Sequence, residues 1–323
     1  MLGSDGPPAP AAPAPASRWR LVVALIAFAL WAHPSLVGLP CAALLVAAPD
    51  RRGRSLPLAG LIGAASVALL LVGGGSGSRL AAVTSAYIVL VTAAFVAGVL
   101  LRPAPFLRQA LRAMAVAGVA TALLIQIVWG RHMWGTEGWA TLAWEATRQA
   151  GLTMRFIVER APDAFRVYEP VVRFVSVTWP GMLALQTLAG LALAWQLHLR
   201  LTSPALGAPL TRFRDFRIGD AWVWGMVAWL GVLILPVSGA LQVAGTNLGL
   251  VAGTLYVLRG AAIVAVFAEA FGVSATALAI AAGAAAALAV PMLFVLPGLC
   301  TLGITDTWYQ YRRRLAARRS NAT

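Results

Sequence analysis

The sequence predicts an all-α integral membrane protein, a polytopic bundle of about eight or nine transmembrane helices. Hydrophobic residues make up 60% of the 323 residues and charged residues only 11%, whereas soluble globular domains carry about 25% charged residues. The apolar runs follow one another almost from end to end, and they lack the alternation of membrane-spanning strands. No polar block is large enough for a separate soluble core. We therefore expect one membrane domain.

The membrane domain is expected to cover residues 18–314, with a tail on either side. Residues 1–17 are mostly Pro, Ala and Gly without hydrophobic periodicity, so they predict a disordered tail. Residues 315–323 are basic and predict a cytoplasmic tail. Arg18 and Arg20 precede an apolar run, as in a signal sequence, but the long tail before them and the spans after them favour an uncleaved first helix.

Eight apolar runs are the expected spans, and two of them are interrupted. The run 21–48 contains His33 and two prolines, so it predicts either one kinked span or a short hairpin. The run 275–304 contains two prolines and several glycines, which favour its division into two short pieces. The other expected spans are 56–72, 80–101, 111–129, 171–199, 221–237 and 247–271.

The net charge of +14 comes from arginines, since the chain has no lysine. Most arginines stand in short clusters between apolar runs, as the positive-inside rule predicts for cytoplasmic loops, which argues against nucleic-acid binding. We expect an inner (cytoplasmic) membrane protein with both termini in the cytoplasm. If each of the three runs after residue 217 crossed the membrane once, the C-terminal arginines would lie outside, against the positive-inside rule. A division of 275–304 into two pieces returns them to the cytoplasmic side.

Residues 130–170 form an expected extramembrane insert, in which charged residues, Trp and Thr replace the apolar runs. Its part 139–158 predicts an amphipathic helix at the membrane surface. The residues at helical spacing are Leu142, Ala146, Gln149, Thr153 and Phe156. The insert is either a structural lid or a segment that recognises a partner.

Motifs of soluble enzymes are missing, so we expect no enzyme, no cofactor and no metal. Without lysine there is no Walker A motif, and no GxSxG nucleophile pattern occurs. The histidines His33, His132 and His198 lie in different segments without a partner at i+3 or i+4, which excludes an HExxH-type zinc site. Cys41 and Cys300 lie in apolar sequence and predict packing rather than a disulfide framework.

Arg259 lies near the middle of the run 247–271, where a charge costs about 2.5–3.5 kcal/mol even on lenient scales. Its side chain must face protein or water. Glu269 is about 15 Å away along the same helix and is too far to be its partner. Two roles stay open, a structural bridge between helices and a site for an anion. The expected partners are Gln126, Gln186, Gln196 and Gln242, or Asp306 if the last span folds back.

Gly245, Gly249 and Gly253 form a GxxxGxxxG pattern, which places one glycine face on this helix. Such a face lets another helix approach closely. The partner helix is expected to come from the same chain, although the pattern also allows a second chain.

Three pieces of the last 120 residues carry a resemblance. The first is FRDFRIGD from Phe213 to Asp220, followed by WVWG. The second opens with Asn247 and continues as LYVLRGAAIV, and the third is LGITDTWYQYR, which contains Asp306, Trp308 and Arg312. In this order and spacing they resemble the YybS-like family of bacterial membrane proteins, a family of unknown function. The chain departs from the family pattern at Gly219, where Pro is usual, and at Arg259, where Gln is usual.

The resemblance implies a function as well as a fold, because YybS-like proteins look distantly related to the S components of energy-coupling-factor transporters. It implies a non-catalytic substrate-binding membrane subunit whose last three helices line a pocket with Arg259, Asn247 and Gln242. The small-molecule ligand is unknown, and transport would require separate ATPase and membrane subunits. The alternative is a scaffold or assembly protein that binds other envelope proteins through the glycine face and the insert 130–170.

Overall fold

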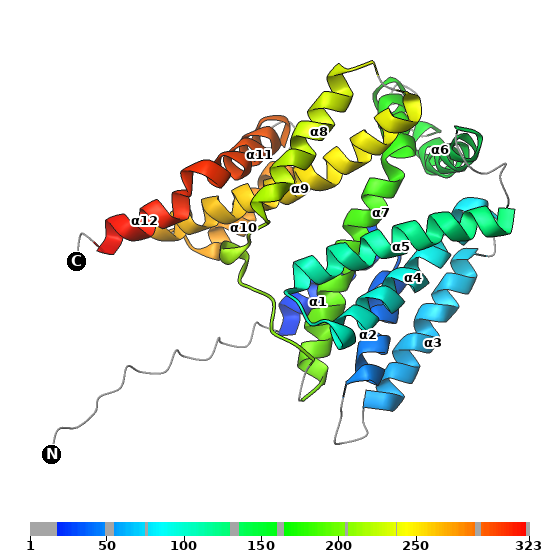
Figure 1. Cartoon of the computed structure of the whole chain (residues 1–323), viewed down its shortest axis with the longest axis horizontal. Helices are drawn as coiled ribbons and strands as arrows, with labels where there is room; N and C mark the ends of the chain where they lie inside the picture. The colour runs from blue at the N-terminus through cyan, green and yellow to red at the C-terminus, as the bar shows by residue number, and fades with distance from the viewer. Residues whose placement is uncertain are drawn as a thin grey trace.

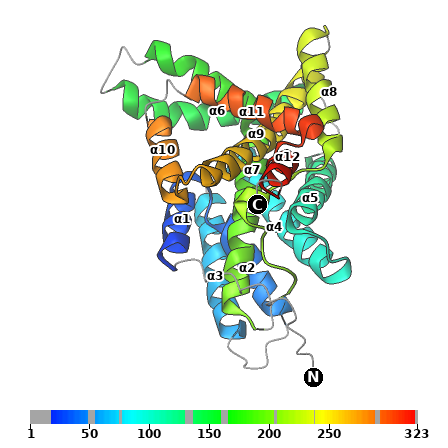
Figure 2. The ribbon, with the colours of Figure 1, turned by 90° about the vertical axis from the view of Figure 1, so that its left-hand side faces the viewer.

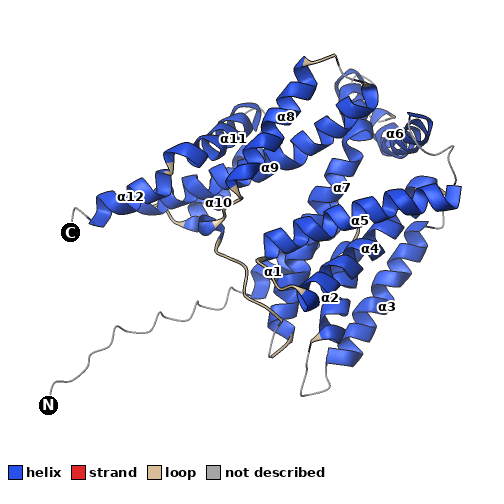
Figure 3. Cartoon of the chain, viewed as in Figure 1, coloured by secondary structure: helices blue, strands red, loops and turns tan. Residues whose placement is uncertain are grey.

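The computed structural model describes residues 18–48, 55–74, 77–129, 136–159, 165–203, 206–236, 238–287 and 292–320. Within these ranges the regular structure is helical and no strand occurs (Figure 3). The predicted all-helical class is therefore confirmed. The tail predicted for residues 1–17 lies outside the described residues.

Five described helices are long and apolar enough to cross a membrane. They are α3 (Ser55–Gly74), α4 (Arg79–Leu101), α5 (Phe106–Trp129), α7 (Phe165–Leu201) and α9 (Gly239–Ala270). These helices support a multi-pass membrane protein. They are fewer than the eight or nine expected, because several of the predicted runs form shorter helices.

The two interrupted runs are both divided. The run 21–48 forms α1 (Arg18–Trp31) and α2 (Ser35–Ala47), which separate at His33 and Pro34. The run 275–304 forms α10 (Ala275–Ala287) and α11 (Met292–Tyr309). The run 221–237 forms α8 (Val223–Ile234), whose 12 residues extend only about 18 Å. Each of these helices is shorter than the hydrocarbon core of about 30 Å.

Two further helices lie in the expected polar segments, and the first of them agrees with the helix predicted over 139–158. The insert contains α6 (Thr136–Val158), in which Leu142 and Ala146 are buried; the side chains of Thr153 and Phe156 lie outside the described part. The boundary expected at residue 314 falls inside α12 (Tyr311–Ser320). Two single 3-10 turns, η3 (Phe213–Asp215) and η4 (Asp220–Trp222), precede α8.

The N-terminal half packs around α2, which contacts α3, α4 and α7. Val91 and Phe95 are one helical turn apart on α4, and they are fully buried with Ala110 of α5 and Trp195 of α7. The Phe95 and Trp195 rings meet edge to face at 5.9 Å. The alanines of α5 are small enough for α4 to approach closely, so large and small side chains interlock in this core.

The helix α7 connects this half to the C-terminal one, because it contacts α2 and α6 as well as α9. Its 37 residues extend about 55 Å. Figures 1 and 2 show α8, α9, α11 and α12 gathered at one end of the molecule and α2, α3 and α4 at the other.

The helices α9 and α11 pack with their backbones in contact. A Cβ atom at Gly260 would overlap the carbonyl of Leu299, and one at Gly303 would overlap the carbonyl of Tyr256. Only glycine permits this approach at both positions. The close contact fixes the position of the last residues of α11 against the middle of α9.

Gly303 and Gly298 provide a test of this contact, because both lie on α11 and a Cβ at Gly298 would meet nothing within 4 Å. We expect Gly303→Ala to lower the free energy of unfolding by about 1–3 kcal/mol, since the two backbones must separate. Gly298→Ala should leave it unchanged or raise it by up to about 1 kcal/mol, because Ala favours a helix. Thermal unfolding in detergent measures the difference, and equal effects of the two changes would contradict the backbone contact.

Candidate functional site

The Arg259 guanidinium is buried and paired with two carboxylates. Its Nε donates to Asp306 Oδ2 at 3.1 Å, and its Nη2 lies 3.1 Å from the same oxygen. Its Nη1 donates to Asp220 Oδ1 and to Thr307 Oγ1, each at 3.3 Å. The side chains of Arg259 and Asp306 are both 6% exposed, while that of Asp220 is 71% exposed. Asp306 is therefore the partner that neutralises Arg259 inside the protein.

This arrangement decides between the predicted partners of Arg259. The last span does fold back, because the division into α10 and α11 returns the chain along α9. None of the four glutamines bonds to Arg259. Glu269 instead accepts from Arg214 at 2.7 and 2.8 Å. The buried pair offsets the cost of desolvating Arg259, as a buried charge requires.

Arg312 extends the cluster to the segment before α8. It lies 3.6 Å from Asp306 Oδ2 and donates to the carbonyls of Arg214 and Phe216 at 2.8 and 3.0 Å. The Tyr311 N–H donates to Asp306 Oδ1 at 3.0 Å. Asp306 thus accepts hydrogen bonds from Arg259 and from the Tyr311 backbone and forms an ion pair with Arg312. The cluster ties the end of α11 to α9 and to the FRDFR segment.

The structure brings the polar residues of the three motifs together, although they are far apart in the sequence. Asp220, Arg259, Asp306 and Arg312 share one hydrogen-bonded cluster. The aromatic side chains of Phe213 and Trp308 are not part of it and are 51% and 63% exposed. The motifs therefore build a structural junction of α8, α9 and α11.

Asn247 joins α9 to α7 at a proline. Its Nδ2 donates to the Val177 carbonyl at 2.9 Å, and its Oδ1 accepts from the Gly181 N–H at 2.7 Å. Val177 and Gly181 are four residues apart, so they are the two groups that would bond to each other in an uninterrupted helix. Pro180 lies between them and disturbs the helix there. The Asn247 amide satisfies both backbone groups at this disturbed turn.

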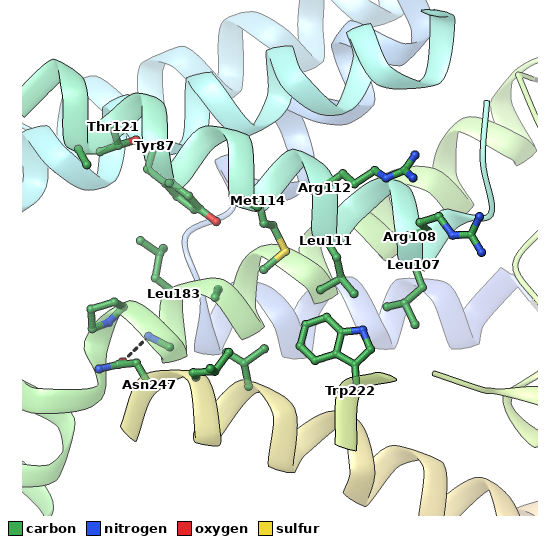
Figure 4. A pocket seen from close by; sticks show the side chains of 18 of the residues that line it. Tyr87, Leu107, Arg108, Leu111, Arg112, Met114, Thr121, Leu183, Trp222 and Asn247 are labelled. Carbon is green, nitrogen blue, oxygen red and sulfur yellow. Dashed lines mark hydrogen bonds between the residues drawn. The ribbon is translucent and has the colours of Figure 1, made fainter. Parts of the chain in front are cut away.

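A cleft of about 990 Å³ lies between α5, α7 and α9. Figure 4 shows Leu107, Leu111 and Met114 of α5 on one side of it, Trp222 and Asn247 on the other, and Leu183 of α7 between them. The other large apolar residues that line it are Val83, Ile125, Leu142, Trp179, Ile218, Leu248 and Val251. Most of its wall is therefore hydrocarbon.

Charged side chains line the cleft at one end. Arg108 and Arg112 lie there on α5, away from Tyr87 and Thr121 at the opposite end (Figure 4). Arg217 also lines the cleft, and the three arginines are exposed. No carboxylate of the described residues pairs with any of them.

A smaller polar pocket of about 150 Å³ lies behind the segment 217–219, which lines both spaces. Arg259, Asp306 and Arg312 line this pocket. The buried cluster thus holds one wall of the apolar cleft in place from behind.

The three residues expected to bind one ligand do not share a pocket. Asn247 lines the cleft, Arg259 lines the small polar pocket, and Gln242 is exposed and lines neither. Arg259 is 12 residues from Asn247 on the straight run of α9, about 18 Å along the axis. The interpretation of these three residues as one site is therefore corrected. The arginines of α5, which line the cleft, had been explained only by membrane orientation.

The glycine face of α9 packs partly against α8. A Cβ at Gly245 would overlap Val232, and a Cβ at Gly249 would overlap the ring of Trp229. A Cβ at Gly253 would have no other atom within 4 Å. The helix that occupies this face comes from the same chain.

The helix α6 contributes Leu142 to the lining of the cleft and is held by Glu145. Glu145 Oε2 accepts from Ser78 Oγ at 2.5 Å and from the Leu80 N–H at 2.7 Å. The carboxylate lies at the first turn of α4, where the helix dipole favours a negative charge. Burial would raise the pKa of Glu145, but these hydrogen bonds and the charge of Arg79 outweigh burial and hold the pKa below its ordinary value.

Comparison with known proteins matches residues 165–307 to the model of a family described as "Predicted membrane protein (DUF2232)". The matched region includes α7, α8 and α9 with Asp220, Arg259 and Asp306, and it ends before Arg312. No curated protein and no solved structure matches the chain. The C-terminal part of the chain is thus similar to a family of membrane proteins.

Asp306 and Asp220 test the burial of the cluster, because both bond to Arg259 but only Asp306 is buried. We expect Asp306→Asn to lower the free energy of unfolding by about 3–5 kcal/mol, since it leaves buried positive charge without a counter-charge. Asp220→Asn should cost less than about 1 kcal/mol, as for an exposed ion pair. Unfolding of detergent-purified variants by heat or denaturant measures both, and a larger effect at Asp220 would refute this account.

The contact of Glu145 with the start of α4 should depend on pH. Because the pKa of Glu145 is depressed in the folded protein, its stabilising effect is complete above the ordinary value of about 4.3 and is lost as the pH falls through the lower folded value. We expect Glu145→Gln to lower the thermal midpoint at pH 7 and to have no effect once the pH is below the folded pKa. Glu159→Gln, which removes a pair exposed to solvent, serves as the control and should change little at either pH.

Proposed function

We propose that the protein is a non-catalytic membrane subunit that binds a largely apolar molecule in the cleft between α5, α7 and α9. The observation that supports this is the cleft itself, which is about 990 Å³ in volume and is lined mainly by apolar residues, among them Leu, Val, Ile, Met, Trp, Ala and Pro. Binding sites for small molecules occupy about 300–1,000 Å³, so the cleft is at the upper end of that range.

The chemistry of the walls restricts the ligand. Apart from the arginines at one end, the polar side chains of the lining are those of Tyr87, Thr121 and Asn247. The Asn247 amide is already bonded to Gly181 and Val177. A polar ligand would lose its hydrogen bonds to water here without replacing them, at a cost of several kcal/mol. A molecule with a long hydrocarbon part avoids this cost.

This proposal keeps the function implied by the YybS-like resemblance but changes the role of Arg259. Its guanidinium is neutralised by Asp306 and Asp220, so it is not free to bind an anionic ligand. It instead bonds to Asp220, the residue that follows the segment 217–219, and this segment forms a wall of the cleft. Likeness to an S component implies a bound substrate and a separate energising ATPase, and it remains part of the proposal.

The proposed topology places both termini in the cytoplasm and counts α1 with α2, and α10 with α11, as broken membrane segments. Arg312 donates to the carbonyls of Arg214 and Phe216, so the arginine-rich segment before α8 and the start of α12 lie on the same side. The positive-inside rule favours the cytoplasmic side for both. With each broken pair counted once, this topology gives eight apolar segments among the described helices, and five of them are of full spanning length.

The alternative of a scaffold protein was based on the glycine face of α9 and on the insert 130–170, and the structure weakens the first of these. Val232 and Trp229 of α8 cover Gly245 and Gly249, so most of the glycine face is occupied within the chain. The other support is α6, where Trp144 and Leu152 are about 60% exposed. Exposed apolar side chains are also expected of a helix at a membrane surface, so they do not favour a protein partner.

Filling the cleft tests the proposal. Gly118 lines the cleft and has nothing within 4 Å of a Cβ position, and Gly60 on the exposed face of α3 has equally open surroundings. We expect Gly118→Phe to weaken binding of a neutral alkyl probe in the cleft by about tenfold, or about 1.4 kcal/mol. Gly60→Phe should leave it unchanged.

The probe is an uncharged lipid with a photoreactive alkyl chain, added to the full-length protein in nanodiscs. Mass spectrometry locates the labelled peptides. Label on the cleft-lining residues of α5, α7 and α9 reports binding in the cleft, and label on α3 reports contact with surrounding lipid. Labelling confined to lipid-facing helices in the wild type, with no effect of Gly118→Phe, would remove the proposed function.

A further inference from the structure

Three arginines line the apolar cleft, and the two on α5 lie at one end of it. The segment of Arg217 meets this end, because Ile218, its neighbour, belongs to the hydrophobic cluster against which Leu107, the neighbour of Arg108, packs. Arg108 and Arg112 are one turn apart on α5 and lie together in Figure 4, while Arg217 lines the cleft from the segment before α8. All three are exposed, and no carboxylate of the described ranges pairs with them. The charge at this end of the cleft is therefore positive and uncompensated by the described chain.

The position of two of these arginines is unfavourable for the isolated protein. Like charges at i and i+4 repel each other on a helix. Arg108 and Arg112 also lie in the first two turns of α5, which carries no acidic residue in its first turn, although the helix dipole favours anions there. A negative group from outside the chain would relieve both effects.

Three other arginines, all in the C-terminal half, have bonding partners within the chain. Arg259 bonds to two carboxylates, Arg214 bonds to Glu269, and Arg312 bonds to backbone carbonyls. The chain thus supplies partners where an arginine is part of the fold. The three arginines that line the cleft have no carboxylate partner within the described part of the chain, which distinguishes them from the structural ones.

We propose that the cleft binds an amphiphile of the membrane, with its oxyanion headgroup at Arg108, Arg112 and Arg217 and its hydrocarbon chain along α5. This inference rests on the proposed function and names the ligand class. Guanidinium groups bind phosphate and carboxylate oxygens through paired hydrogen bonds. A phosphate fits three guanidinium groups best, because it has more acceptor oxygens than a carboxylate has.

The geometry of the cleft matches such a molecule. Arg112 and Ile125 both line it, and the 13 residues that separate them on α5 extend about 20 Å. Leu142 of α6 lines the cleft together with Ile125. The charged group therefore lies near the start of a membrane-spanning helix, at the depth of lipid headgroups, and the long apolar part lies within the hydrocarbon region.

The experiment varies the headgroup while the chain is held constant. Full-length protein in nanodiscs of neutral lipid is exposed to photoreactive probes with one long alkyl chain that ends in phosphate, carboxylate, hydroxyl or trimethylammonium. We expect the phosphate probe to label the cleft peptides at about tenfold lower concentration than the hydroxyl probe, as charge-assisted hydrogen bonds predict. The carboxylate probe should fall between them.

Matched variants separate the cleft arginines from general surface charge. Arg108→Gln with Arg112→Gln, and separately Arg217→Gln, should remove the preference for phosphate but leave labelling by the hydroxyl probe. Arg102 and Arg212 are exposed arginines of the neighbouring loops that do not line the cleft. Arg102→Gln and Arg212→Gln should keep the preference, and thermal midpoints verify that all variants fold.

Each other outcome has a defined meaning. Equal labelling by all four probes, still within the cleft, would overturn the headgroup inference and leave the proposed function intact. A loss of preference in Arg102→Gln equal to that in the double variant would overturn it as well, because surface charge would then explain the result. Complete competition by inorganic phosphate would show a site for a soluble anion and overturn the assignment to an amphiphile. Absence of cleft labelling by any probe would overturn both proposals.

Discussion

The buried pair of Arg259 and Asp306 is the interaction on which the C-terminal half depends. A guanidinium in the interior of an apolar helix must be neutralised by the protein, since lipid offers no counter-charge. Asp306 can reach Arg259 only because α11 returns along α9, and it does so with the backbones in contact at Gly260 and Gly303. The charge therefore requires the close helix packing, and the packing holds the charge pair. Arg312 then binds the segment before α8 to the same carboxylate.

The sequence predicted the helical membrane class well, because the length of an apolar run is limited directly by the thickness of a bilayer. It also predicted that runs 21–48 and 275–304 are interrupted, since proline removes a helical hydrogen bond. It did not predict the position, because Pro40 and Pro297 lie inside α2 and α11. It did not predict how the pieces fold back. Whether a broken run continues or reverses depends on its contacts, and the partner of Arg259 could be chosen only once α11 was placed beside α9.

The cleft was beyond the reach of the sequence for a similar reason. Its walls come from α5 and α9, more than one hundred residues apart, and from the irregular segment 217–219. Arg108 and Arg112 follow a loop, and arginines in that position are equally well explained by orientation in the membrane. Asn247 carried a clearer signal, because an amide in an apolar run needs a partner. That partner proved to be the backbone of α7 beside Pro180, which no local pattern on α9 indicates.

The separation of the paired charges along the chain bears on biosynthesis. Arg259 leaves the ribosome 47 residues before Asp306, which corresponds to roughly 2 to 10 s at 5–20 residues per second. During this interval Asp220 is the acidic partner of Arg259 that has already been made, and it is exposed in the folded protein. The buried pair with Asp306 is thus completed only after the synthesis of α9. The carbonyls of Arg214 and Phe216, just before the wall 217–219, likewise gain their bonds to Arg312 only after α9 and α11 have been made.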